Sequence, residues 1–214
     1  MAGLDEQDLK AIVESARVQF DAVHTDREHA LRAARLTIQL SSRAIRAAHR
    51  GEMDEARNLA KQAGDEILPA AKSTRARREF FDSGLLHDAE KEYVEATLTI
   101  AALSNESLPS ADDLGVGPAP YMNGLAEAAS ELRRSILDQL RAGELETAER
   151  LLGFMDMVYA ALITLDYPDA VTRGLRRTTD QFRAVLERTR SDLTVAARQL
   201  ALEERLRQVA DGLE

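Results

Sequence analysis

Residues 90–96 read Glu-Lys-Glu-Tyr-Val-Glu-Ala, and they lie in a run from about Leu85 to Leu103 whose composition and spacing predict an α-helix. Glu92 and Glu95 are three positions apart, so a helix places both carboxylates on one face. Most other residues of the run are apolar or small. Carboxylates in so apolar a helix are not typical of a plain solvated face, and we interpret them as a candidate functional pair.

A second acidic pair, Glu127 and Glu131, stands four positions apart in a predicted helix from about Tyr121 to Ala142. If the two helices pack side by side, up to four carboxylates converge, and clusters made only of oxygen ligands suit Mg²⁺ or Mn²⁺. The spacing alone fits a simpler interpretation equally well. In that case Lys91 or arginines of neighbouring helices neutralise the first pair, and Glu131 reaches Arg134 three residues further on.

Residues 92–96 resemble the E-Y-V-E-A motif of the translin family, as found in its translin-associated factor X (TRAX) branch. Residues 124–132 resemble the second acidic segment of that branch, G-x-x-[D/E]-x-x-x-E-L. The first predicted helix is also similar, through Arg27–Arg32 and its continuation to Gly51. The likeness is collinear over nearly all of the chain and is that of an archaeal or prokaryotic-like, single-chain member.

The resemblance implies an all-helical subunit that forms a hollow homo-oligomer, an octamer in the family. It also implies binding of RNA or single-stranded DNA and a divalent-metal-dependent endoribonuclease activity on single-stranded RNA. Carried over residue by residue, it implies Glu92, Glu95 and Glu127 as catalytic carboxylates. The same three and Glu131 would be the ligands of Mg²⁺ or Mn²⁺. Glu127 stands where animal TRAX proteins carry Asp, and the extra methylene would displace a metal by about one carbon–carbon bond.

The composition is that of a helical protein with a substantial core. The chain has 214 residues, 44% of them apolar, and this length favours a single domain over residues 1–214. There is no cysteine, so disulfides and thiolate metal sites are excluded. No apolar run approaches the ~18 residues of a membrane span. We therefore expect a cytoplasmic protein that makes no membrane contact.

The charge balance limits how nucleic acid could bind. The net charge is −9, which argues against a protein coated in basic surface, so RNA would need a local basic patch. The best candidate is Arg75, Arg77 and Arg78, because it lies nearest in sequence to the acidic helix. The chain carries no P-loop, dinucleotide-binding fingerprint or nucleophile elbow.

The periodicity predicts an elongated antiparallel bundle of about six or seven helices and no strands. A first helix from Asp5 to His49 has no Pro or Gly and would be a rod of about 68 Å. The second begins near Met53, and Pro69 predicts its end or a kink. A loop is expected over 105–120, followed by helices over 121–142 and 144–165. A last helical region is expected over 170–209, with Asp166 as its cap and a possible break near Ser191.

Three functions stay open at this point. The first is the metal-dependent endoribonuclease described above. The second is an oligomer that binds RNA or single-stranded DNA without cleaving it. The third is a helical scaffold for protein interactions with no nucleic acid, for which the net charge of −9 is the best support.

Overall fold

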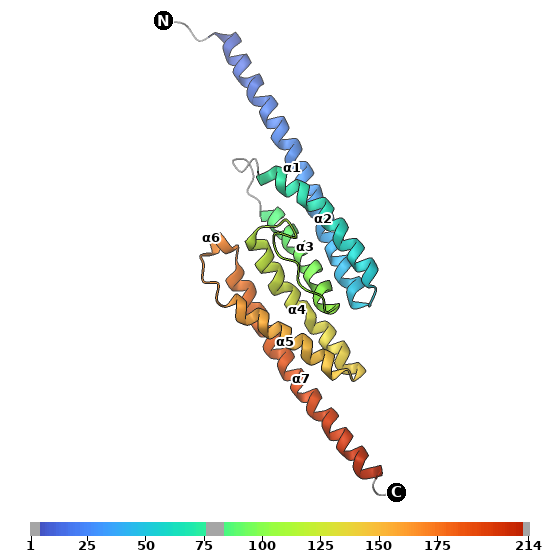
Figure 1. The fold of residues 1–214 in the computed structure, drawn as a ribbon. Helices are drawn as coiled ribbons and strands as arrows, with labels where there is room; N and C mark the ends of the chain where they lie inside the picture. The colour runs from blue at the N-terminus through green and yellow to red at the C-terminus, as the bar shows by residue number, and fades with distance from the viewer. Residues whose placement is uncertain (1–4, 76–83, 212–214) are drawn as a thin grey trace.

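The computed structural model is an elongated all-α bundle, as the sequence predicts (Figure 1). It describes residues 5–75 and 84–211, apart from the side chains of Thr74, Arg75 and Leu85. Within these ranges there are helices and connecting segments and no strand. The helices are α1 (Glu6–His49), α2 (Met53–Arg75), α3 (Gly84–Leu103), α4 (Pro118–Ala142), α5 (Leu145–Leu162), α6 (Asp169–Thr172) and α7 (Leu175–Asp211).

The longest helix, α1, starts and ends where the sequence predicts. The Asp5 side chain accepts a hydrogen bond from the Gln7 backbone N–H at 3.1 Å and so caps the first turn. Beyond His49 the chain turns at Gly51, whose φ of +79° is a conformation that glycine adopts without strain. The N-terminal half of α1 projects from the bundle and is largely exposed, whereas the half from Ala30 onward packs on α2 and α3 (Figure 1).

The core consists of two apolar clusters that meet at α3 and α4. One is formed by α1, α2, α3 and the start of α4, together with Leu114 and Val116 of the preceding loop. The other is formed by α4, α5 and α7, with Ala102 of α3 at its edge. Because α4 contributes to both clusters, its position against α3 is fixed from both sides.

The sequence predicts an end or a kink of the helix at Pro69, and the prediction of an end is wrong. Pro69 lies inside α2, which continues to Arg75. A proline in a helix removes one backbone hydrogen bond and usually kinks the helix. Here the flanking Ile67 and Ala71 are both buried, so packing on both sides of the proline keeps the segment helical.

The boundaries in the second half of the chain also differ from prediction. The loop ends earlier than expected, since Pro118 begins α4 and occupies a first-turn position where its missing N–H costs nothing. Pro168, not Asp166, precedes α6, which stops after one turn at Arg173 in the left-handed region, with φ of 54°. α7 then runs without a break through Ser191. Among the described residues, every helix falls short of the combined length and apolarity that crossing a membrane requires.

Candidate metal centre between α3 and α4

A glycine brings the two acidic helices close together. A Cβ added at Gly124 of α4 would lie 2.7 Å from Cγ1 of Val94 and 2.8 Å from the carbonyl oxygen of Lys91, both on α3. No side chain fits there, so glycine is what allows this close approach. Val94 and Lys91 lie in the stretch 90–96 that carries Glu92 and Glu95, so the contact sets the distance between the two acidic segments.

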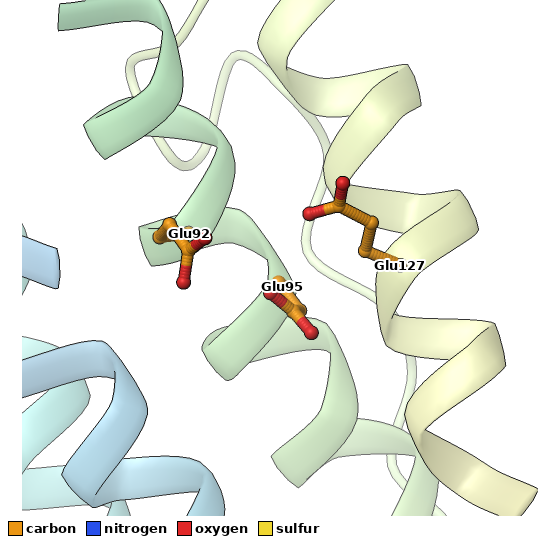
Figure 2. Close-up of side chains that lie close together, drawn as sticks. All are labelled: Glu92, Glu95 and Glu127. Atoms are coloured by element: carbon orange, nitrogen blue, oxygen red, sulfur yellow. The ribbon is translucent and has the colours of Figure 1, made fainter. Parts of the chain in front are cut away.

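Three of the four predicted carboxylates converge across this contact. Glu92 and Glu95 of α3 and Glu127 of α4 each offer an oxygen atom, and these atoms lie within 4.8 Å of one another. Figure 2 shows Glu127 reaching from α4 toward the face of α3 that carries the other two. All three side chains are half-buried. Half-burial and convergence distinguish Glu127 from the ordinary solvated face that the simpler interpretation assigns to it.

The three charges are poorly compensated. Burial raises the pKa of the Glu95 carboxyl to about 8, and the charges of Glu92, Glu127 and Glu131 add to the effect while Lys91 opposes it. Burial also raises the pKa of Glu92, against the opposing influence of Lys91. Close carboxylates in a partly dry site resist ionisation unless a cation lies between them.

Lys91 supplies a single positive charge to the cluster. Its Nζ donates a hydrogen bond to Oε1 of Glu127 at 2.8 Å, and both side chains are mostly shielded from water. Burial lowers the pKa of Lys91, but the bond and charge of Glu127 and the charge of Glu92 outweigh it, so the pKa is raised overall. In the simpler interpretation Lys91 is one of the residues that neutralise Glu92 and Glu95. Its hydrogen bond goes to Glu127, and its charge opposes the rise in the pKa of Glu92 and Glu95.

Glu131 lies outside the set of three. It stands one turn beyond Glu127 on α4, and its Oε1 lies 2.7 Å from Nε2 of His49, the last residue of α1. His49 is a residue that the sequence did not single out for the site. It is 82 positions away from Glu131, so no local sequence pattern could have linked the two.

The predicted basic patch consists of side chains outside the described part of the chain. Arg77 and Arg78 lie outside the described residues, and so does the side chain of Arg75, the last residue of α2. The role of this basic patch in binding nucleic acid stays a prediction.

The cluster fits a hard divalent cation. Mg²⁺ takes oxygen ligands at about 2.1 Å, so neighbouring ligands are about 3.0 Å apart and opposite ones about 4.2 Å apart. Oxygens that lie within 4.8 Å of one another need only small side-chain rotations to reach those distances. The all-carboxylate donor set suits Mg²⁺ or Mn²⁺ rather than a metal that prefers nitrogen or sulfur.

Solved structures resemble this chain over nearly its whole length. AfC3PO is 34% identical in sequence, with a TM-score of 0.79 over 86% of this chain and 96% of AfC3PO. A complex of AfC3PO with duplex RNA has the same identity and coverage and a TM-score of 0.76. Apo-NeC3PO, with a TM-score of 0.76 over 92% of this chain and 100% of its own, is 18% identical and shows the fold alone.

Comparisons by sequence give a shorter match. No family model matches the chain. The uncharacterized protein MJ0175 of Methanocaldococcus jannaschii is 34% identical over 131 residues, which are 61% of this chain and 59% of that protein. The matched stretch therefore spans less than two thirds of that relative.

Proposed function

Since the chain belongs to the C3PO/translin family, we propose that it binds RNA and cleaves it with a divalent cation held by Glu92, Glu95 and Glu127. AfC3PO, to which it is similar over most of its length, has been solved with duplex RNA. The observation that carries the catalytic part of the proposal is the meeting of three half-buried carboxylates from two helices.

Each carboxylate has a role in this proposal. Glu92, Glu95 and Glu127 supply the oxygen ligands, and any of them that is not a ligand during the reaction accepts a proton from the attacking water. As the water oxygen bonds to phosphorus, the bond from phosphorus to the leaving oxygen breaks, and that oxygen takes up a proton. A bound Mg²⁺ or Mn²⁺ ion would neutralise the clustered charge, activate the water and stabilise the charge that develops on the phosphoryl oxygens.

We also propose a homo-oligomer, because two segments that extend beyond the bundle, the N-terminal half of α1 and the C-terminal part of α7 (Figure 1), carry apolar side chains that this chain leaves uncovered. The side chains that are at least half exposed on α1 are Leu9, Ile12, Val13, Val18 and Phe20; those on α7 are Val195, Leu202, Leu206 and Val209. Exposed apolar surface on this scale marks an interaction surface more often than a solvated one.

A cleavage assay tests the catalytic part. The purified chain is incubated with labelled single-stranded and duplex RNA, with Mg²⁺, with Mn²⁺ or with EDTA. We expect cleavage only with metal, and its loss in the double variant Glu92→Gln with Glu95→Gln. Glu149→Gln makes the same chemical change at an exposed position of α5 and should cleave as the wild type does.

The assay also separates the alternatives. Metal-independent cleavage, or cleavage that survives in the double variant, would remove these carboxylates from the mechanism. Salt-dependent RNA binding without cleavage would leave a silent RNA-binding oligomer. If RNA and single-stranded DNA both fail to bind at low salt, the scaffold interpretation holds instead.

A further inference from the structure

A buried histidine connects α1 to the carboxylate site. The side chain of His49 is 1% exposed and lies between two residues of α4. Its Nε2 is 2.7 Å from Oε1 of Glu131, and its Nδ1 is 3.0 Å from Oγ of Ser135. Both ring nitrogens are therefore used, and α1 contributes to the surroundings of the site although it supplies none of the three clustered carboxylates.

The two partners define which ring nitrogen carries a proton. An ionised carboxylate only accepts hydrogen bonds, so the ring proton belongs on Nε2, facing Glu131. Nδ1 then accepts from the Ser135 hydroxyl, which can rotate to donate. A ring with one proton thus satisfies both contacts, and the orientation of His49 is fixed from both sides.

This serine, histidine and glutamate arrangement is not a nucleophilic triad. A triad needs a serine oxygen that the substrate can reach. Ser135 is 8% exposed and belongs to the buried face of α4. Its hydroxyl holds the ring in place.

Glu131 lies beside the proposed ligands without joining them. It is four residues after Glu127, so it occupies the next turn on the same face of α4. The side chain is 33% exposed, so its position depends on what holds it.

We propose that His49 is a positioning residue: its Nε2–H holds Glu131 as an outer carboxylate one turn from Glu127, and this strengthens divalent-cation binding by the three inner carboxylates. Without that bond, repulsion by three neighbouring carboxylates would turn the flexible Glu131 side chain toward water. Partners of this outer kind orient ligands and add to the electrostatic field at a cation. The inference rests on the proposed function, since it assumes that the inner cluster binds a cation.

Mn²⁺ affinity, measured on the full chain without RNA by the electron paramagnetic resonance signal of free Mn²⁺, tests the inference. We expect His49→Ala and Glu131→Gln each to weaken binding by about tenfold, the lower end of the range for outer-shell changes. The double variant should bind no more weakly than the weaker single one, because both changes remove the same interaction. His49→Gln places an amide donor near the former Nε2 and should restore most of the affinity.

A structural role for His49 would give different results. Far-ultraviolet circular dichroism and thermal melts establish that each variant is folded. If His49→Ala does not fold, the two single variants Glu131→Gln and His49→Gln test the positioning role of His49. The inference is overturned if folded His49→Ala binds Mn²⁺ as the wild type does, if His49→Gln gives no recovery, or if the two single effects add.

The same titration separates this inference from the proposed function. A wild type that shows the expected coupling in Mn²⁺ affinity but cleaves no RNA supports the role of His49 and removes the endoribonuclease. A wild type that binds no Mn²⁺ removes both. In either case the ¹⁵N chemical shifts of the His49 ring report directly whether Nε2 carries the proton.

Discussion

At the scale of single residues, Glu95 makes the stability of the metal-free protein depend on pH. Its pKa in the folded protein is about 8, against an ordinary value of 4.5. Between these values the native state keeps a proton that the unfolded chain has lost, so unfolding free energy falls as pH rises. The stability that the raised pKa of Glu95 contributes to the metal-free protein is fully present below about pH 4.5 and is lost as pH rises through about 8.

Glu95→Gln should remove this dependence. We expect the metal-free variant to melt several degrees above the wild type at pH 9, given about 2–4 °C per kcal/mol for a protein of this size. The two proteins should converge near pH 5. Mn²⁺ should raise the melting temperature of the wild type at pH 8.5 and leave the variant nearly unchanged, with Glu149→Gln as the control. Parallel pH profiles for wild type and Glu95→Gln would contradict the prediction.

Lys91 is the second residue whose substitution should change a measurable property, here Mn²⁺ affinity, in a definite direction. Its ammonium group competes with a cation for Glu127, to which it donates at 2.8 Å. Lys91→Gln should therefore increase Mn²⁺ affinity by about three- to tenfold, which corresponds to a partly shielded ion pair of around 1 kcal/mol. Isothermal titration calorimetry measures the change.

A matched control exists for this substitution. Lys61 pairs with Asp65 on the exposed face of α2 at 2.8 Å, so Lys61→Gln removes a similar contact away from the site. Its Mn²⁺ affinity should equal that of the wild type. A decrease in affinity for Lys91→Gln would show that the ammonium group supports the site rather than competing for it.

The sequence identifies the site only in part, and the reason is physical. Glu92 and Glu95 share a helical face by their spacing alone, and the motif pair adds Glu127. Their convergence depends on how α3 packs on α4, which local spacing does not specify. The contact between His49 and Glu131 joins residues 82 positions apart, so only the tertiary fold reveals it.

At the scale of helices, the close approach at Gly124 predicts a steric test. Gly124→Ala puts a methyl group 2.7 Å from Val94, and α3 and α4 must separate to accept it. We expect a loss of about 1–3 kcal/mol in unfolding free energy, as for overpacked cores, together with weaker Mn²⁺ binding. Thermal denaturation and the Mn²⁺ titration measure the two effects.

Gly153→Ala is the matched control for the same change in a helix. Gly153 is exposed on α5 and nothing lies within 4 Å of an added Cβ. Replacing a helical glycine by alanine at an open position should stabilise by about 0.5–1 kcal/mol and leave Mn²⁺ binding unchanged. If Gly124→Ala proved as stable as Gly153→Ala and bound Mn²⁺ normally, the α3–α4 contact would not set the site geometry.

The helices themselves were predictable where local chemistry and packing agree. The cap at Asp5, the turn at Gly51 and the stop at Gly143, with φ of +80°, follow from residue type. Pro69 predicts an end or a kink because proline is unfavourable inside a helix, and packing on both sides of it lets α2 continue. The α6 turn was not predictable from Asp166, because Pro168 precedes the helix and Arg173 ends it in a left-handed conformation.

At the scale of the whole molecule, the shape agrees with the predicted elongated bundle. The solved relatives confirm the resemblance to the translin family. Membership of the TRAX branch stays a prediction. The 44-residue α1 is longer than the bundle beside it (Figure 1). An isolated helix is marginally stable in water, and most helical stability in proteins comes from packing an apolar face. The proposed homo-oligomer would supply such packing, because a second copy of the chain would cover the uncovered apolar side chains of the projecting half of α1.

Polar substitutions on the apolar face of the projecting half of α1 should lower the number of subunits in the oligomer. Ile12 and Phe20 are eight residues apart, which places them on neighbouring positions of one face, and both are about two-thirds exposed. We expect Ile12→Ser with Phe20→Ser to lower the mass measured by light scattering after size-exclusion chromatography. Glu14→Ser with Gln19→Ser changes exposed polar residues of the same segment and should leave the mass unchanged. Since the carboxylate cluster belongs to one chain, the smaller species should still bind Mn²⁺; a wild type that is monomeric at all concentrations would refute the oligomer.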